Sequence, residues 1–141
     1  MKVMSLLIVT LLTMACQNKA SIPIASAQPD SLQMEVSELP VSKSEPDARF
    51  FAVRIYPPGQ NVQKLPVSIK ETLEYKVDSS FYMVNARGGS GFPMVQSVQN
   101  GRKDCFEYLL VFDKKDLISS TSLVYSDACF DHKKHIYLLK N

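Results

Sequence analysis

The sequence predicts a mainly β protein, a small antiparallel meander of about seven strands folded as a sandwich or a barrel. Short runs rich in aromatic and β-branched residues recur from residue 50 onward in the 141-residue chain, and clusters of Pro, Gly or Asn separate them. All aromatic residues lie at or beyond Phe50, so the core belongs to that part. The length suits one domain. One helix is left open, which would make the fold α+β.

The first predicted strand covers residues 50–56, FFAVRIY, and ends at a Pro-Pro-Gly break. In residues 67–77 five of the six odd-numbered side chains are apolar, which favours a strand. A helix beginning near Pro66 is the alternative, because apolar residues also recur at a spacing of four and Lys, Glu and Leu favour helices. That second pattern consists of Leu65, Ile69, Leu73 and Val77.

The remaining strands are predicted from similar runs separated by short connections. Asn100-Gly101 is the strongest two-residue signal for a hairpin turn. The run after this turn is apolar on both faces, as expected of a central, covered strand. The predicted strands cover residues 80–86, 92–99, 105–112, 122–125 and 135–140.

The N-terminus predicts an export signal over residues 1–15. A positive Lys2 precedes an uncharged, largely apolar run from Val3 to Ala15. This run is shorter than the ~20 residues that a membrane-spanning helix needs, so a secretory signal peptide fits better.

The residues that end this run, LLTMAC (11–16), resemble the cleavage box of bacterial lipoprotein precursors. The resemblance implies that Cys16 becomes the lipidated first residue and anchors the protein to a membrane of the cell envelope. Gln17, which is not Asp, implies the outer membrane, facing the periplasm, if the source is Gram-negative. A secretory cleavage after Ala25-Ser26-Ala27, leaving a soluble chain that begins at Gln28, is the alternative.

The segment from residue 17 to residue 48 is predicted to be a disordered tether between Cys16 and a β-rich domain at 49–141. It has no aromatic residue, and it holds four of the eight prolines and six serines. We therefore expect a chain that begins at Arg49 to fold as well as the longer form.

Cys105 and Cys129 are predicted to form a disulfide. They are the two cysteines that remain once Cys16 is assigned to the lipid, and exported proteins meet an oxidising compartment.

His132 and His135 are the only histidines, and Asp127 and Asp131 lie close to them in the sequence. These residue types bind metals and catalyse hydrolysis. The spacing of three places the histidines on opposite faces of a strand, so a solvated turn is favoured. We predict no metal, no cofactor and no catalytic residue, and a small periplasmic hydrolase using this turn is the alternative function.

The domain from Arg49 onward is mildly basic, with 13 Lys or Arg against 9 Asp or Glu. In a meander the turns at 100–103 and 131–134 fall at the same end, which would bring together Arg102, Lys103, Lys133 and Lys134. Basic residues at turns often only keep strands apart, but they also suit an acidic partner. Location and modest charge argue against nucleic acid. The sequence thus predicts a lipid-anchored envelope module that contacts another protein, of the inhibitor, immunity or assembly-factor type.

Overall fold

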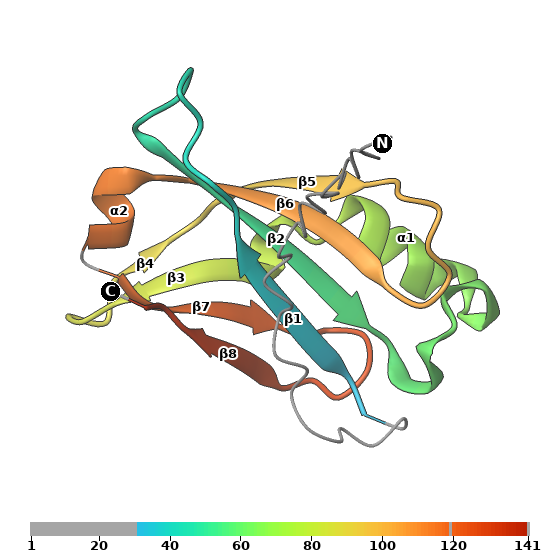
Figure 1. Ribbon diagram of the computed structural model, residues 1–141. Coiled ribbons are helices and arrows are strands. Elements are labelled where there is room, and N and C mark those ends of the chain that lie inside the picture. Colours follow the sequence, from blue (N-terminus) through green and yellow to red (C-terminus); the bar gives the residue numbers. More distant parts are fainter. Residues whose placement is uncertain (1–30, 119, 141) are drawn as a thin grey trace, which may run out of the picture.

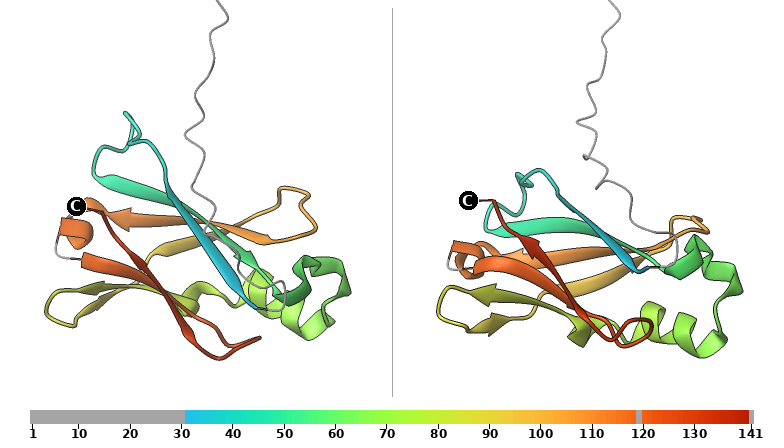
Figure 2. Two further views of the ribbon diagram at one scale, coloured as in Figure 1. Left: turned by 60° about the horizontal axis from the view of Figure 1, so that its bottom comes forward. Right: turned by 90° about the horizontal axis from the view of Figure 1, so that it is seen from below.

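Two antiparallel four-stranded sheets face each other in the computed structural model, which describes residues 31–118 and 120–140 (Figures 1 and 2). This confirms a mainly β sandwich. The predicted signal at 1–15 and Cys16 lie outside the described residues. Sheet A has the order β1 (Gln33–Glu38), β2 (Ala48–Tyr56), β6 (Phe106–Asp113), β5 (Met94–Val98). Sheet B has the order β4 (Ser90–Gly91), β3 (Phe81–Asn85), β7 (Ser120–Ser126), β8 (Lys134–Leu138).

The strand order departs from a simple meander. β2 pairs with β6 and β3 pairs with β7, although neither pair is consecutive in the chain. These four strands carry most of the fully buried side chains and take the central positions of the two sheets. The most apolar strands therefore take the central positions of their sheets, because a central strand is flanked by another strand at each of its two edges.

β1 corrects the predicted tether at 17–48 for the part that the structure describes, residues 31–48; residues 17–30 lie outside the described ranges. It pairs with β2 along its whole length, from Gln33 opposite Tyr56 to Glu38 opposite Phe51. Met34 and Val36 pack against the core, and Leu32 just before the strand is buried. The alternation of Leu32, Met34 and Val36 with polar residues is the period of a strand that covers one side of a core.

Most of residues 67–77 form a helix rather than the favoured strand. α1 extends over Val67–Tyr75, directly after Pro66, and lies at one end of the sandwich (Figure 1). Leu73 and Val77, which fit the spacing of four, are buried. Val67 and Tyr75, which fit only the spacing of two, are 65% and 75% exposed. The other elements are α2 (Lys114–Ile118) and the 3₁₀ turns Pro58–Gln60, Val62–Lys64 and Asp78–Ser80.

Neither helix in the described ranges has the length and apolar character needed to cross a bilayer.

The core lies between the sheets and centres on three aromatic rings. The ring centroid of Phe81 lies 5.4 Å from that of Tyr108 and 5.0 Å from that of Tyr125. Both buried hydroxyls have partners: Tyr108 donates to the carbonyl oxygen of Leu73 at 2.6 Å, and Tyr125 donates to Oδ1 of Asp127 at 3.2 Å. The first bond ties α1 to sheet A, and the second ties sheet B to the β7–β8 turn.

Candidate functional site

The β5–β6 turn holds two of the predicted binding residues, Arg102 and Lys103. Gly101 adopts a φ of 72°, which glycine tolerates, and the N–H of Arg102 donates to Oδ1 of Asn100 at 2.9 Å. The guanidinium of Arg102 makes two hydrogen bonds to Asp104, at 2.9 and 2.7 Å, and lies 5.9 Å from the ring centre of Tyr56. Arg102 is therefore neutralised by its own turn.

A polar depression of about 240 Å³ lies beside this turn and reaches Val62, Glu74 and Lys103. Pockets that enclose drug-sized ligands usually measure about 300–1,000 Å³. Cys105 lines the depression, and burial raises the pKa of its thiol to about 11. A thiol with this pKa is protonated near neutral pH and is a poor nucleophile.

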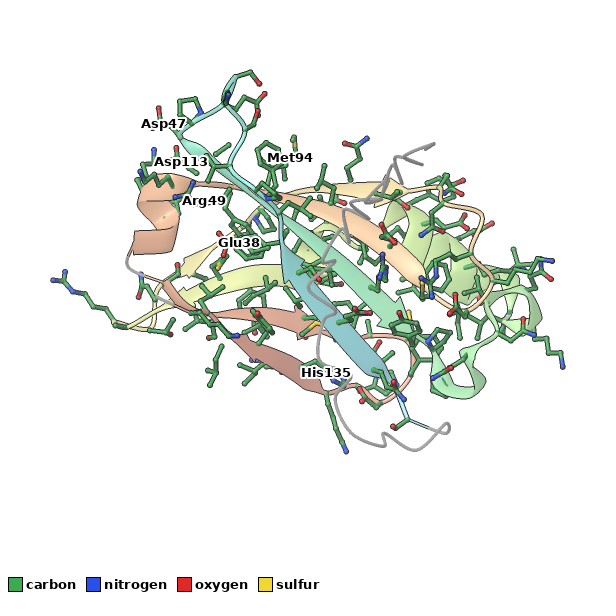
Figure 3. The ribbon with its side chains drawn as sticks, viewed as in Figure 1. Glu38, Asp47, Arg49, Met94, Asp113 and His135 are labelled. Atoms are coloured by element: carbon green, nitrogen blue, oxygen red, sulfur yellow. The ribbon has the colours of Figure 1, made fainter. Side chains whose placement is uncertain are left out.

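A larger open concavity, of about 480 Å³, lies at the opposite end of the sandwich between the β1–β2 loop and the end of β6. Asp47 and Asp113 line it, and Arg49 and Glu38 lie close by (Figure 3). Nε of Arg49 is 3.8 Å from Oε1 of Glu38. None of the sequence-predicted site residues lies in it.

The β7–β8 turn is organised by Asp127, which is 4% exposed. Its Oδ2 accepts the backbone N–H groups of Phe130, Asp131 and His132 at 2.7, 2.7 and 3.1 Å. Its Oδ1 accepts the N–H of Cys129 at 3.2 Å as well as the hydroxyl of Tyr125. Burial by itself would raise the pKa of this carboxyl, but the backbone donors outweigh burial and lower it. The predicted solvated turn is thus built around a buried carboxylate.

The two histidines do not form one site. The N–H of His132 is bound to Asp127, and its φ of 56° is left-handed. His135 lies on β8 (Figure 3), where its Nε2 is 2.9 Å from Oδ2 of Asp131 and its ring centre is 6.2 Å from that of Tyr125. Within residues 31–118 and 120–140, no three His, Cys, Asp or Glu side chains are grouped as metal ligands.

Lys133 and Lys134 follow this turn, at the same end of the sandwich as the β5–β6 turn (Figure 1). The turns belong to different sheets. Arg102 lies against Tyr56 of sheet A, whereas Nζ of Lys134 lies 6.0 Å from the ring centre of Tyr82 on the outer side of sheet B. The structure therefore does not form the predicted cluster from all four basic residues.

Lys134 belongs instead to an apolar surface that sequence reasoning missed, which we name the sheet B outer face. Register places Tyr82, Val124 and Ile136 in one row across β3, β7 and β8, and Val84, Ser122 and Leu138 in the next. The ring of Phe92 lies 6.2 Å from that of Tyr82 and extends the first row. Phe92, Ile136 and Leu138 are 67%, 63% and 73% exposed. The only sequence signal was that the run HIYLLK is apolar at both even and odd positions.

The charge on the sheet B outer face is of one sign. The four strands of sheet B contain no Asp or Glu, and Lys133, Lys134 and Lys140 lie in or next to β8. On the outside of sheet A, in contrast, Nε of Arg54 donates to Oε2 of Glu107 at 2.8 Å, and this bond is the main cause of the lowered pKa of Glu107. Basic charge is therefore neutralised on sheet A and left available on sheet B.

The predicted Cys105–Cys129 disulfide is absent from the structure, in which both residues are free thiols. Cys105 precedes β6 of sheet A, and Cys129 lies in the Asp127 turn of sheet B, so the two belong to opposite layers of the sandwich. A disulfide requires Cα atoms within about 7 Å and converging side chains.

No family model, curated protein or solved structure matches the chain significantly.

Proposed function

We propose that the chain is a lipid-anchored module of the cell envelope that binds another protein through the sheet B outer face. The observation that supports this most is the exposure of Phe92, Ile136 and Leu138, each above 60%, on the outer side of sheet B. Ile136 and Leu138 are neighbours along β8, and the buried Val124 lies between Ile136 and the Tyr82–Phe92 pair. Contiguous exposed apolar side chains are typical of interaction surfaces. The flanking lysines suit a partner with acidic residues.

The anchor is proposed from the residues LLTMAC, which end in Cys16. Leu32 is buried in the core and β1 begins at Gln33, so residues 17–31 separate the proposed lipid from the sandwich. Fifteen residues span at most about 54 Å. A domain attached to the membrane by a linker of this length can bind a partner in the same membrane or in the adjacent compartment.

The class of partner follows from the resemblance to lipoproteins of this size, which serve as inhibitors, immunity proteins or assembly factors. An inhibitor or immunity protein would form a tight one-to-one complex. An assembly factor would co-purify with a larger envelope machine. For each class of partner, we propose that the sheet B outer face forms the contact.

Crosslinking in intact cells, followed by mass spectrometry, tests the binding function. We expect the wild type to be crosslinked to one recurrent protein, and the double variant Ile136→Glu/Leu138→Glu to lose that product. The matched control is Val67→Glu/Tyr75→Glu, which introduces the same charges at two exposed apolar positions of α1. Equal loss in both variants, or none in either, would contradict the proposal.

Fractionation and intact mass measurement test the anchor. Lipidation predicts a membrane-bound wild type with acyl mass on Cys16, because several acyl chains bind a bilayer far more durably than one. The Cys16→Ala variant should remain unprocessed at this site or become soluble. A soluble wild type that begins at Gln28 would refute the anchor and leave the binding face untouched.

A further inference from the structure

β8 offers an edge on which another strand can pair. It is the last strand of sheet B, and the opposite edge of that sheet, β4, has only two residues. Within the described residues, β8 pairs on one side only, with β7. A peptide strand can add to such an edge through main-chain hydrogen bonds.

The register shows which backbone groups of β8 face this open edge. The N–H of Asp127 donates to the carbonyl of Lys133, and the N–H of Leu139 donates to the carbonyl of Thr121. In an antiparallel ladder these hydrogen-bonded positions alternate along the strand. The odd-numbered residues of β8 therefore bond to β7, and Lys134, Ile136 and Leu138 direct their N–H and C=O groups away from it.

The side chains of the same three residues lie on the sheet B outer face, because they alternate with the half-buried His135 and Tyr137. A strand paired to this edge would thus place every second side chain beside Lys134, Ile136 and Leu138. Main-chain pairing and side-chain contact would then involve the same three residues of β8.

A second copy of the chain is a poor occupant of this edge. If two β8 strands paired antiparallel about Ile136, Lys134 of each copy would lie diagonal to Lys140 of the other. Diagonal neighbours lie about 7–8 Å apart, within reach of long side chains, so the two positive charges would oppose this pairing. Sheet B has no acidic residue on its strands to offset this repulsion.

We propose that β8 binds an extended segment of a partner protein as an added antiparallel strand, with an acidic side chain beside Lys134 and apolar side chains beside Ile136 and Leu138. This rests on the proposed protein-binding function and specifies its mode. The five residues of β8 span about 17 Å, which matches about five paired residues of a bound segment.

A synthetic peptide, Ser-Val-Thr-Val-Thr-Glu-Ser with blocked ends, serves as the probe. Paired antiparallel to β8, its two valines and its glutamate fall beside Leu138, Ile136 and Lys134. The measurement is amide hydrogen exchange by NMR on the full chain, with the probe at millimolar concentration. We expect exchange at Lys134, Ile136 and Leu138 to slow at least fivefold, while the amides of His135 and Tyr137 stay protected with and without the probe.

Three controls make the result decisive. A probe N-methylated at the two valines and the glutamate keeps all side chains but cannot pair, and should give no protection. A probe with Lys in place of Glu should bind more weakly to the wild type, and Lys134→Glu should reverse this preference. Vesicles containing phosphatidylglycerol should leave the alternating exchange pattern unchanged.

The proposal is overturned if the N-methylated probe protects equally, if no amide of β8 responds, or if the vesicles protect β8 in place of the peptide. The last result would make the face a membrane contact. In-cell crosslinking that is unaffected by the Ile136→Glu/Leu138→Glu variant, or that falls equally in the α1 control variant, would instead contradict the proposed function. The two failures are therefore distinguishable.

Discussion

Asp127 is the residue on which the local structure of the β7–β8 turn most depends. Four backbone N–H groups and one tyrosine hydroxyl converge on its carboxylate. The sequence indicates a polar turn there, but nothing in the pattern distinguishes Asp127 from Asp131. The distinction arises because Asp127 follows a core strand and is buried, whereas Asp131 is partly exposed.

Replacing Asp127 with Ala should destabilise the fold strongly. The change leaves several buried donors without acceptors, and we expect a loss of roughly 2–4 kcal/mol in the free energy of unfolding. Asp131→Ala, in the same turn, should cost less than half as much. Urea denaturation of both variants measures the difference, and equal losses would mean that the carboxylate network contributes little.

The contribution of Asp127 should also be visible in how the stability of the fold depends on pH. The folded pKa of Asp127 lies below its ordinary value, so its contribution is complete at neutral pH and is lost as the pH falls below about 4. Asp127→Asn should flatten this part of the profile relative to the wild type. Denaturation midpoints between neutral and strongly acidic pH test this, and parallel profiles would contradict it.

The thiols of Cys105 and Cys129 should be free and slow to react. Burial is the main cause of the raised pKa of both groups, to about 11 at Cys105. We expect iodoacetamide to label both in denaturant without any reductant, and to label the native protein far more slowly near neutral pH. Peptide mapping that finds a Cys105–Cys129 bridge in envelope material would show that the oxidised protein differs from this structure.

At the scale of elements, sequence patterns predict the central strands well and the peripheral elements poorly. β2 and β6 are rich in aromatic and branched residues on both faces, so few other structures suit them. β1 lies in a Pro- and Ser-rich segment, and the composition of that segment does not reveal its pairing with β2. Val67–Tyr75 fits the period of a strand except at Glu71, and it also fits the period of a helix. The helix buries Leu73, whose carbonyl accepts the hydroxyl of Tyr108.

Removal of β1 tests this view. A chain that begins at Arg49 loses the pairing with β2 and exposes the core beneath Met34 and Val36. We expect it to be less stable by about 3–5 kcal/mol than a chain that begins at Ser31, a large share of the stability of an ordinary domain. Thermal unfolding of the two forms provides the comparison, and equal melting temperatures would restore residues 31–48 to the role of a dispensable tether.

At the scale of the whole molecule, the two sheets differ in the character of their outer faces. On sheet A, Arg54 donates to Glu107 and Tyr56 donates to Glu35, whereas sheet B exposes apolar side chains beside Lys133 and Lys134. The sequence predicts the sandwich but not this difference, because it depends on which strands neighbour each other. Arg102, in the β5–β6 turn, and Lys134, the first residue of β8, consequently differ: the charge of Arg102 is paired with Asp104, whereas Lys134 lies over Tyr82 on the sheet B outer face.

Site-specific photo-crosslinking tests the central claim most directly. A photoreactive amino acid at Leu138 reports on the sheet B outer face, and one at Tyr75, about equally exposed on α1, is the control. In intact cells we expect position 138 to crosslink to one protein with several times the yield of position 75. Equal yields at the two positions, or a recurrent product from position 75 alone, would contradict the assignment of binding to sheet B.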